Sequence, residues 1–347
     1  MTDRAPAQDV NAMNQSPRSD VDANDHARSI FRLSTRKGWL WWFWLFFLEN
    51  PTHRARPRQV AVLWSAKNDD ALICNGKVMG AKHVYVADGI LNGGIAAWYY
   101  DGARMHDQLL LDRVQIGLDD SGLSTAAPDT AFRFRDGGFH IVLGSRMAFQ
   151  ATLLDPTNSF VSPWKKGLTY LGYGYEMLGI NRLALTAHVD GETLAGSGYF
   201  QKVVLGAPAV PWYWGIFHFE HGACLSYFNP RLLGRSIKED VSLYDGRTLH
   251  RFDALRIEKT GGALPAYHVT AENREEAIAF TVEPYAETVW RFRKKKWGFI
   301  PVKFDYGQYP ARITRLRLTN KRDHAALTEE DLGIGVGNAE DSTGVLF

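Results

Sequence analysis

The chain lacks most of the features that mark metal, redox and nucleotide-binding proteins. Only two of its 347 residues are cysteines, Cys74 and Cys224, too few for a four-ligand structural zinc site. They either form a disulfide or serve as two small buried hydrophobic residues. The formal net charge is only +2, so no overall field recruits nucleic acid or an anionic membrane.

Short catalytic motifs are also missing. The sequence contains no G-x-S-x-G and no H-E-x-x-H, which argues against an ordinary serine hydrolase or a helical zinc site. His218-Phe-Glu220 matches the start of the zinc deaminase motif, but the P-C-x-x-C that should follow is absent. Gly333 to Gly337 lacks the lysine of a phosphate loop. We therefore expect no metal and no cofactor.

Long hydrophobic runs are absent as well. Trp39 to Leu48 is ten residues long, whereas a membrane-spanning helix needs about 20. Its Trp and Phe content favours a strand buried on both faces, with an interfacial membrane anchor as the alternative. The polar N-terminus, up to about residue 28, resembles neither a signal nor a transit peptide and is expected to be disordered. We expect a soluble, cytoplasmic protein, with peripheral membrane contact left open.

Aromatic residues and glycine are abundant, with 11 Trp, 14 Tyr, 19 Phe and 32 Gly. Short alternating runs recur between Gly, Asn and Asp turns, a pattern typical of β-sandwiches and barrels. The best helical pattern is a short turn at Thr328 to Leu332, with Thr328 as its N-cap. We predict an all-β protein with a disordered tail (1–30), one β domain (31–200), a second (201–320) and a polar, loosely held C-terminal tail (321–347).

The stretch from Trp212 to Phe228 predicts an aromatic β-hairpin with His221-Gly222 as its turn. Strict alternation would place Trp214, His218 and Tyr227 on one face. Both faces are largely apolar, so the hairpin is expected to be buried or to line a cavity. His218 and Tyr227 would then be the polar groups of that cavity.

Two further aromatic segments carry polar groups. In Trp98-Tyr-Tyr-Asp-Gly102, burial of Asp101 beside the aromatics would raise its pKa and make it a proton donor. The alternative is a plain Asp-Gly turn after a core strand. In Gly198-Tyr-Phe-Gln-Lys202, Lys202 either lines the same cavity or faces water from a linker strand.

A basic segment, Arg291 to Lys296, lies beside Trp290 and Trp297. It could bind phosphate or single-stranded nucleic acid. A solvated edge strand protected by its charge is the preferred interpretation, so we expect no nucleic-acid partner.

The Trp-rich first strand, Trp98-Tyr-Tyr-Asp-Gly102, Gly198-Tyr-Phe-Gln-Lys202 and Trp212-Tyr-Trp-Gly-Ile-Phe-His218 together resemble the carotenoid 1,2-hydratase and tocopherol-cyclase-like family. The similarity runs in order through residues 35 to 320. It implies two tandem lipocalin-like, calycin-type antiparallel β-barrels. It also implies cofactor-independent hydration, cyclisation or isomerisation of a hydrophobic, often isoprenoid, substrate. The family's His-x-Trp motif is replaced here by Gln201-Lys202 and Trp214-Gly215.

The predicted function is to bind a hydrophobic ligand, such as a carotenoid or another isoprenoid, in an aromatic β-barrel cavity. Proton transfer to the bound ligand would then follow. Asp101 or His218 would move the proton, with Tyr227 and Lys202 as secondary catalytic candidates, because these side chains can exchange protons. The predicted substrate-binding residues are Trp98, Tyr100, Tyr199, Trp212 and Trp214, whose rings would stabilise a carbocation. The alternatives are a lipid or pigment carrier of the same fold, and a carbohydrate-binding sandwich with exposed Trp. The oligomeric state stays open.

Overall fold

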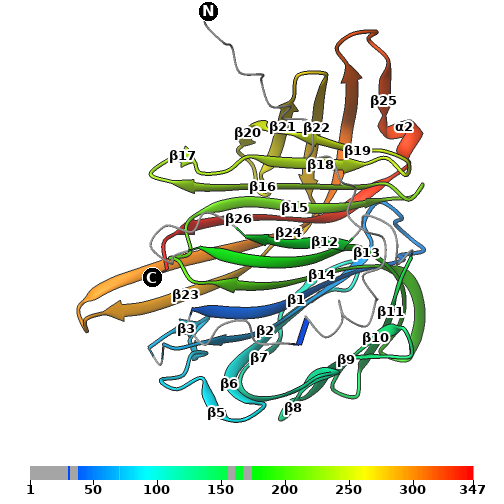
Figure 1. Cartoon of the computed structure of the whole chain (residues 1–347). Coiled ribbons are helices and arrows are strands. Elements are labelled where there is room, and N and C mark those ends of the chain that lie inside the picture. The colour runs from blue at the N-terminus through cyan, green and yellow to red at the C-terminus, as the bar shows by residue number, and fades with distance from the viewer. Residues whose placement is uncertain (1–29, 32–37, 70, 155–160, 167–173, 347) are drawn as a thin grey trace, which may run out of the picture.

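The computed structural model describes residues 30–31, 38–69, 71–154, 161–166 and 174–346 (Figure 1). The tail predicted to be disordered lies outside these residues, apart from residue 30. Almost all of the described chain is β-structure, so the prediction of an all-β fold is confirmed. Trp39–Leu48 forms β1, and nearly every side chain of this strand is buried, as expected.

The N-terminal half forms a closed antiparallel barrel. The hydrogen-bonded order is β11-β10-β9-β8-β7-β6-β2-β1-β14-β13, and β11 pairs with β13 to close the ring. β5 pairs with β6, and β12 pairs with β13, outside this ring. The bounds are β1 (Trp39–Leu48), β2 (Arg58–Lys67), β5 (Tyr85–Ala87), β6 (Ile90–Tyr100), β7 (Met105–Asp119), β8 (Gly122–Ala126), β9 (Asp129–Arg135), β10 (Gly138–Leu143), β11 (Met147–Leu153), β12 (Val161–Lys166), β13 (Tyr175–Val189) and β14 (Glu192–Leu205).

The C-terminal half forms a second, 14-stranded sheet with the order β19-β18-β16-β15-β26-β24-β22-β21-β20. β17, β23 and β25 pair at its sides, and β3 and β4 join it from the N-terminal half of the chain. The bounds are β3 (Ile73–Cys74), β4 (Lys77–Val78), β15 (Trp212–Phe219), β16 (Cys224–Leu232), β17 (Arg235–Ser236), β18 (Asp240–Tyr244), β19 (Leu249–Phe252), β20 (Ala254–Thr260), β21 (Ala266–Glu272), β22 (Glu276–Pro284), β23 (Thr288–Lys296), β24 (Ile300–Asn320), β25 (Ala326–Thr328), α2 (Glu329–Leu332) and β26 (Gly335–Gly344).

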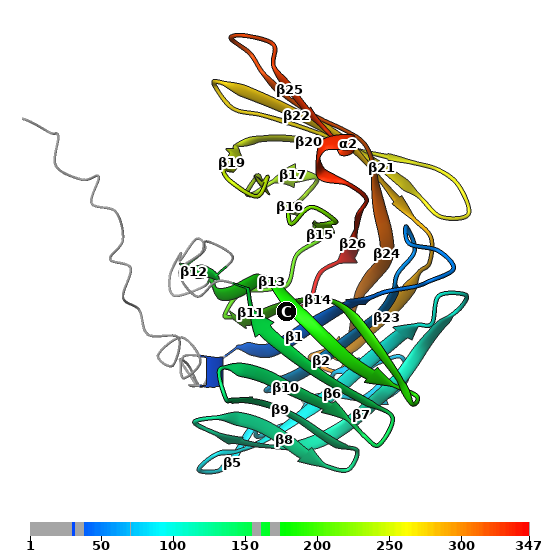
Figure 2. The ribbon, with the colours of Figure 1, turned by 90° about the vertical axis from the view of Figure 1, so that its right-hand side faces the viewer.

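The second sheet curves around its own core (Figure 2). Among the described residues, no strand pairing joins β19 to β20, so this unit is an open, curled sheet where a second closed barrel was expected. The backbone amide of Leu255 on β20 donates to the Glu239 carboxylate near β18 (2.8 Å), which draws the two ends together.

The prediction of a loosely held C-terminal tail is wrong. β26 lies between β15 and β24 in the middle of the second sheet, and its side chains are mostly buried. Gly335 and Gly337 allow this close packing, because a Cβ on Gly337 would lie 2.0 Å from the Ile216 carbonyl oxygen. The short helix α2 does follow the predicted N-cap, Thr328. The predicted domain limit at residue 200 falls inside β14, which belongs wholly to the barrel.

The β15–β16 hairpin forms, but its register differs from the prediction. His218 pairs with Cys224, so residues 220–223 form a longer turn than His221-Gly222 alone. A one-residue change in register moves every side chain of the second strand to the opposite face. His218 and Tyr227 therefore point to opposite sides of the sheet, and the expectation that they share a cavity is wrong.

Three hydrophobic cores follow from this architecture. The first fills the barrel, and its large aromatic side chains include Trp44, Trp64 and Phe132. The second lies between the outer side of the barrel wall and the second sheet. The third lies inside the curled second sheet. Cys74 and Cys224 are both free and buried in the second core, which confirms them as small hydrophobic residues.

Candidate functional site

The layer between the barrel and the second sheet holds the candidate site, and we call it the interdomain face. The outward side of β1, β6 and β14 supplies one wall, and the inward side of β15, β23, β24 and β26 supplies the other. All five aromatic residues predicted to bind substrate belong to this layer. They are Trp98, Tyr100, Tyr199, Trp212 and Trp214.

These rings make contacts both across the layer and within its walls. Tyr199 on the barrel wall lies against Trp214 on the sheet, with ring centroids 5.3 Å apart. Trp212 lies edge-on to Tyr306 at 5.4 Å. The Trp98 indole on β6 donates a hydrogen bond to Gln308 Oε1 on β24 (2.5 Å), which ties the two walls together. The fold thus brings the five aromatic residues named from the sequence into one layer.

Glu340 on β26 is the buried carboxyl group of this layer, with 4% of the residue exposed. The Trp212 indole donates to its Oε2 atom (2.9 Å), and the Tyr306 hydroxyl donates to its Oε1 atom. Burial raises the pKa of Glu340 to about 7, although these two hydrogen bonds act in the opposite direction. At neutral pH the group therefore exchanges between acid and carboxylate.

The neighbouring residue, Asp341, shows how unusual this environment is. Asp341 points to the other side of β26, where its Oδ2 atom meets Lys259 Nζ at 2.6 Å and the Tyr267 hydroxyl at 3.2 Å. Glu340 has no ion pair with a basic side chain among the residues described. Two successive carboxyl groups thus lie on opposite faces of one strand, and only Asp341 has a cationic partner.

Several buried amide and hydroxyl groups around Glu340 lack hydrogen-bond partners within the described structure. They are Gln59 Oε1, Thr288 Oγ1, Gln308 Nε2 and both polar atoms of Asn338. Gln308 is the direct cross-strand neighbour of both Glu340 and Thr288. A buried polar group without a partner costs about 1–3 kcal/mol. The interdomain face therefore offers unused donors and acceptors inside an aromatic layer.

Asp101 lies outside this layer, at the turn between β6 and β7. Its carboxylate accepts from the backbone amides of Ala103 and Arg104 (both 2.9 Å) and contacts the His106 ring at 2.7 Å. Burial acts to raise its pKa, but these hydrogen bonds outweigh that effect and lower the pKa to about 2. The expected upward shift is wrong, because the aromatics before Asp101 turn into the core while its carboxylate caps a turn.

His218 lies at the edge of the interdomain face, edge-on to Phe47. Its Nε2 atom is 2.6 Å from the Asn181 carbonyl oxygen, and its Nδ1 atom is 2.7 Å from Ser197 Oγ. Because a carbonyl can only accept, Nε2 carries the proton and Nδ1 accepts from the serine. Burial, and then the charge of Arg182, lowers the pKa of His218 well below 6.5. The ring is neutral, and both nitrogens are engaged within the protein.

The other two catalytic candidates face separate cores. Lys202 is fully buried inside the barrel, 6.0 Å from the Trp42 ring centre, and burial lowers its pKa to about 7 although Glu176 opposes the shift. Tyr227 lies inside the second sheet, stacked with Phe217, and burial raises its pKa above the usual range. The structure therefore does not bring the four predicted catalytic residues together.

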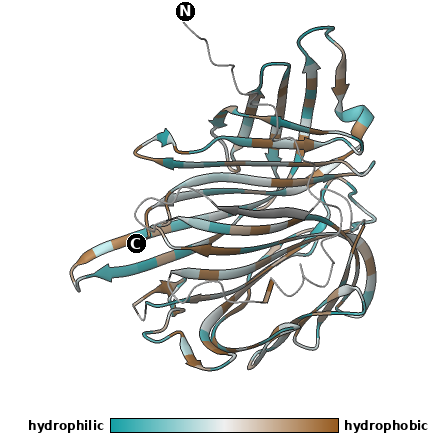
Figure 3. Ribbon diagram, viewed as in Figure 1, coloured by the Kyte–Doolittle hydropathy of each residue, from teal (hydrophilic) through white to brown (hydrophobic). Residues whose placement is uncertain are grey.

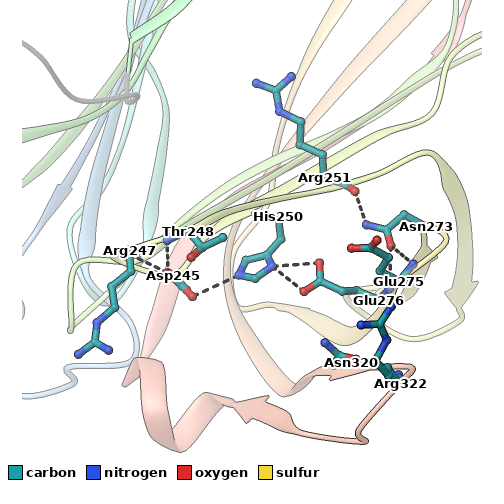
Figure 4. Close-up of polar contacts among 10 residues, drawn as sticks. All are labelled: Asp245, Arg247, Thr248, His250, Arg251, Asn273, Glu275, Glu276, Asn320 and Arg322. Atoms are coloured by element: carbon teal, nitrogen blue, oxygen red, sulfur yellow. Dashed lines mark hydrogen bonds and ion pairs between the residues drawn. The ribbon is translucent and has the colours of Figure 1, made fainter. Parts of the chain in front are cut away.

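Another titratable cluster lies at the far end of the second sheet (Figure 4). His250 Nδ1 is 3.0 Å from both oxygens of Glu276, and its Nε2 is 3.2 Å from Asp245 Oδ2. Asp245 also accepts from the backbone amides of Arg247 and Thr248. The histidine thus links two turns, and no grouping suited to a metal ion occurs in the described part of the chain.

The sequence prediction missed Glu340, Tyr306, Gln308 and Asn338. The available signal was the alternation in β26, where Asn338, Glu340 and Ser342 share one face while Gly337, Ala339 and Asp341 share the other. β26 has no run of apolar side chains. The neighbouring strands provide the large side chains of the cores, and the glycines of β26 let the backbones pack closely. Its polarity therefore resembled that of a surface segment.

Comparisons with known proteins concern the fold. No family model matches the sequence, and no curated protein matches it. The crystal structure of an AttH candidate from Nitrosomonas europaea is similar over 90% of this chain and 94% of that one, with a TM-score of 0.53 and 13% identity.

CghA with Sch210972 covers 88% of this chain and 89% of its own at a TM-score of 0.47 and 9% identity, and CghA alone covers 88% of each chain at 0.46 and 9%. No helix in the described ranges is long and apolar enough to cross a membrane. The closed barrel, its aromatic-rich interior and the first of these likenesses define a lipocalin-like fold.

Proposed function

We propose that the interdomain face binds a hydrophobic ligand and that Glu340 transfers a proton to it, without a cofactor. The observation that carries the proposal is a buried carboxyl group, with its pKa raised to about 7, among aromatic rings and without a basic partner in the described structure. A carboxyl group in this state can donate a proton at neutral pH and take one back. The five predicted aromatic residues would hold the ligand.

The reaction follows from the surroundings of the carboxyl group. Glu340 gives its proton to one carbon of a C=C bond, and the other carbon becomes cationic. Rings such as Trp98, Tyr199 and Trp214 favour that cation through their electron-rich faces. Water then adds and loses a proton in hydration. In cyclisation a second double bond adds before a proton is lost, and in isomerisation a proton is lost directly. In each case the proton returns to the Glu340 carboxylate.

Neighbouring groups would position the acid and the ligand. Tyr306 and Trp212 each donate to one carboxyl oxygen and fix the plane of the group. The unpartnered Nε2 of Gln308 and the side-chain amide of Asn338 can hydrogen-bond to a polar group of the ligand. A largely apolar molecule with a double bond and one polar end suits this set, which agrees with the isoprenoid substrates implied by the sequence resemblance.

A carrier that binds the same ligand without reaction is the second candidate function. One observation favours it: both oxygens of Glu340 already accept hydrogen bonds from the protein. If these bonds persist when ligand is present, the carboxyl group would serve to shape the layer and would not reach a double bond.

The test begins with the bound compound. We would extract the purified protein with organic solvent, identify co-purifying lipids by mass spectrometry, and then supply the compound to wild type and to Glu340→Gln. We expect both proteins to bind it and only wild type to convert it. Glu283→Gln is the matched control, because Glu283 pairs with Arg312 away from the layer. Conversion by Glu340→Gln at the wild-type rate would exclude the acid role, and unchanged ligand with both proteins would support the carrier.

A further inference from the structure

Two hairpin tips carry large exposed hydrophobic side chains. Trp297 and Phe299, between β23 and β24, are 73% and 72% exposed. Leu233, between β16 and β17, is 95% exposed. We propose that these two tips dock the protein on the surface of an anionic lipid membrane. This surface is separate from the interdomain face and does not depend on the function proposed there.

The backbone conformation at two of these tip positions disfavours large hydrophobic side chains. Two turns of the barrel place Asp136 or Asp190 at positive φ before a glycine, and the β3–β4 turn does the same with Asn75. These residue types tolerate that conformation. Leu233 and Trp297 occupy the same position, with φ of 50° and 53°, also before a glycine. A bulky hydrophobic residue is strained there. Each tip therefore has an unfavourable free energy from backbone strain and another from the exposure of apolar surface to water.

The longer hairpin is also strongly basic. Residues 291 to 305 include six Lys and Arg side chains and one acid, Asp305, although the whole chain has a net charge of only +2. Lys295 and Lys303 are exposed near the tip, and Lys296 lies 5.0 Å from the Trp297 ring centre. Basic groups near an anionic bilayer strengthen binding by roughly fivefold each. Arg235 adds an exposed positive charge beside Leu233.

The two tips extend to the same side of the molecule, the left side in Figure 1. In Figure 3 the β23–β24 hairpin shows a hydrophilic strand beside hydrophobic residues at the start of β24. Exposed Ile300 continues the apolar tip. A flat membrane could therefore meet both tips together, with the basic side chains at the level of the lipid headgroups.

The side chains favour lipid over single-stranded nucleic acid. Nucleic-acid platforms use aromatic rings on which bases stack, and the aliphatic Leu233 and Ile300 cannot act in that way. Tryptophan, in contrast, prefers the boundary between headgroups and acyl chains. Exposed apolar residues rimmed by polar ones mark interaction surfaces, and the basic rim here complements negative lipid charge.

The test is co-sedimentation of the full chain with large vesicles of 7:3 phosphatidylcholine to phosphatidylserine (about 30% anionic lipid, enough to set up the surface potential that attracts basic segments), and with pure phosphatidylcholine. We expect wild type to bind the anionic vesicles and to dissociate as salt is raised. The variant Trp297→Ala/Phe299→Ala should bind at least about tenfold more weakly, because it loses the apolar tip. Lys295→Glu/Lys303→Glu should bind more weakly still to anionic vesicles, by more than about tenfold.

Matched controls lie away from both tips. Val86→Ala removes another exposed apolar side chain, on β5. Arg274→Glu/Arg322→Glu reverses two exposed charges at the opposite end of the second sheet. Both controls should bind as wild type does. The proposal is overturned if wild type stays in the supernatant, if the tip variants bind as tightly as the controls, or if a deoxythymidine oligonucleotide displaces the protein from vesicles and itself depends on Trp297 and Phe299.

Discussion

The barrel interior and the interdomain face are both built from aromatic side chains, but they differ in how their polar groups are paired. Inside the barrel, the Trp64 indole donates to Thr130 Oγ1 (3.0 Å), which in turn contacts Thr125 Oγ1 (2.7 Å), while the Trp44 indole is without a partner among the described residues. In the interdomain face, a larger set of buried polar atoms has no partner in the described structure, among them Gln308 Nε2 and both polar atoms of Asn338. A layer selected only for stability would pair or remove such groups, so the interdomain face is the better candidate for binding.

Each layer also holds a buried ionisable group whose pKa is shifted to about 7, and the two groups are of opposite type. Lys202 lies in the barrel, and Glu340 lies in the interdomain face. Burial moves both pKa values to about 7, one downward and the other upward. The two layers should therefore respond to pH with opposite signs, and the following predictions use this difference.

The largest expected effect is the pH dependence that Lys202 contributes. Its pKa is 10.5 in the unfolded chain and about 7 in the folded one, so the unfolded state binds more protons between these values. Stability then rises with pH across that window, by at most on the order of 5 kcal/mol. Urea unfolding at pH 7 and 9.5 should show this rise in wild type, and Lys202→Met should lack it. Equal slopes in both proteins would contradict the buried position of the amine.

The packing of the barrel gives the next largest effect. Phe132 contacts the rings of Trp44, Phe139 and Phe200, so Phe132→Ala should leave a cavity. We expect the free energy of unfolding to fall by about 3–5 kcal/mol, measured by urea denaturation. Phe132→Leu is the milder control, and a loss below 1 kcal/mol for the alanine variant, on the scale of a well-tolerated core swap, would show a loosely packed interior.

Glu340 should give a slope of the opposite sign. Its pKa is 4.5 in the unfolded chain and about 7 in the folded one, so the folded state binds more protons in that window. Stability then falls as pH rises from 4.5 to 7, by on the order of 3 kcal/mol. The difference between wild type and Glu340→Gln isolates this contribution from that of His218. A difference that does not change with pH would mean that the carboxyl group is ionised throughout.

The smallest effect tests the hydrogen bond across the layer. Trp98→Phe keeps the aromatic ring and removes the donor to Gln308 Oε1, so we expect a loss of about 1 kcal/mol, the size of one buried hydrogen bond. Trp98→Phe combined with Gln308→Met should recover part of that loss, because both polar partners are then gone. Chemical denaturation of the single and double variants measures the coupling, and strict additivity would argue that the two side chains act independently.

The sequence predicted the layer better than the chemistry within it. Aromatic residues such as Trp98 and Trp214 were recognised because alternating apolar positions directly reflect burial. Glu340 was missed because its burial depends on β26 pairing with β15 and β24, more than 100 residues and about 30 residues away. The direction of the pKa shift of Asp101 was predicted wrongly, because the backbone amides that bind its carboxylate are placed by a turn geometry that residue type alone does not reveal.

The short β3–β4 hairpin carries a consequence for unfolding. It arises between two barrel strands, yet Cys74 pairs with Phe292 on β23 of the second sheet. The Asn75 side chain adds hydrogen bonds to the backbone of Val289 and Arg291. Neither half can unfold without breaking these contacts between β3 and β23 and exposing the apolar layer between the two halves. The barrel and the second sheet should therefore melt in one cooperative transition, with no stable half-folded species between.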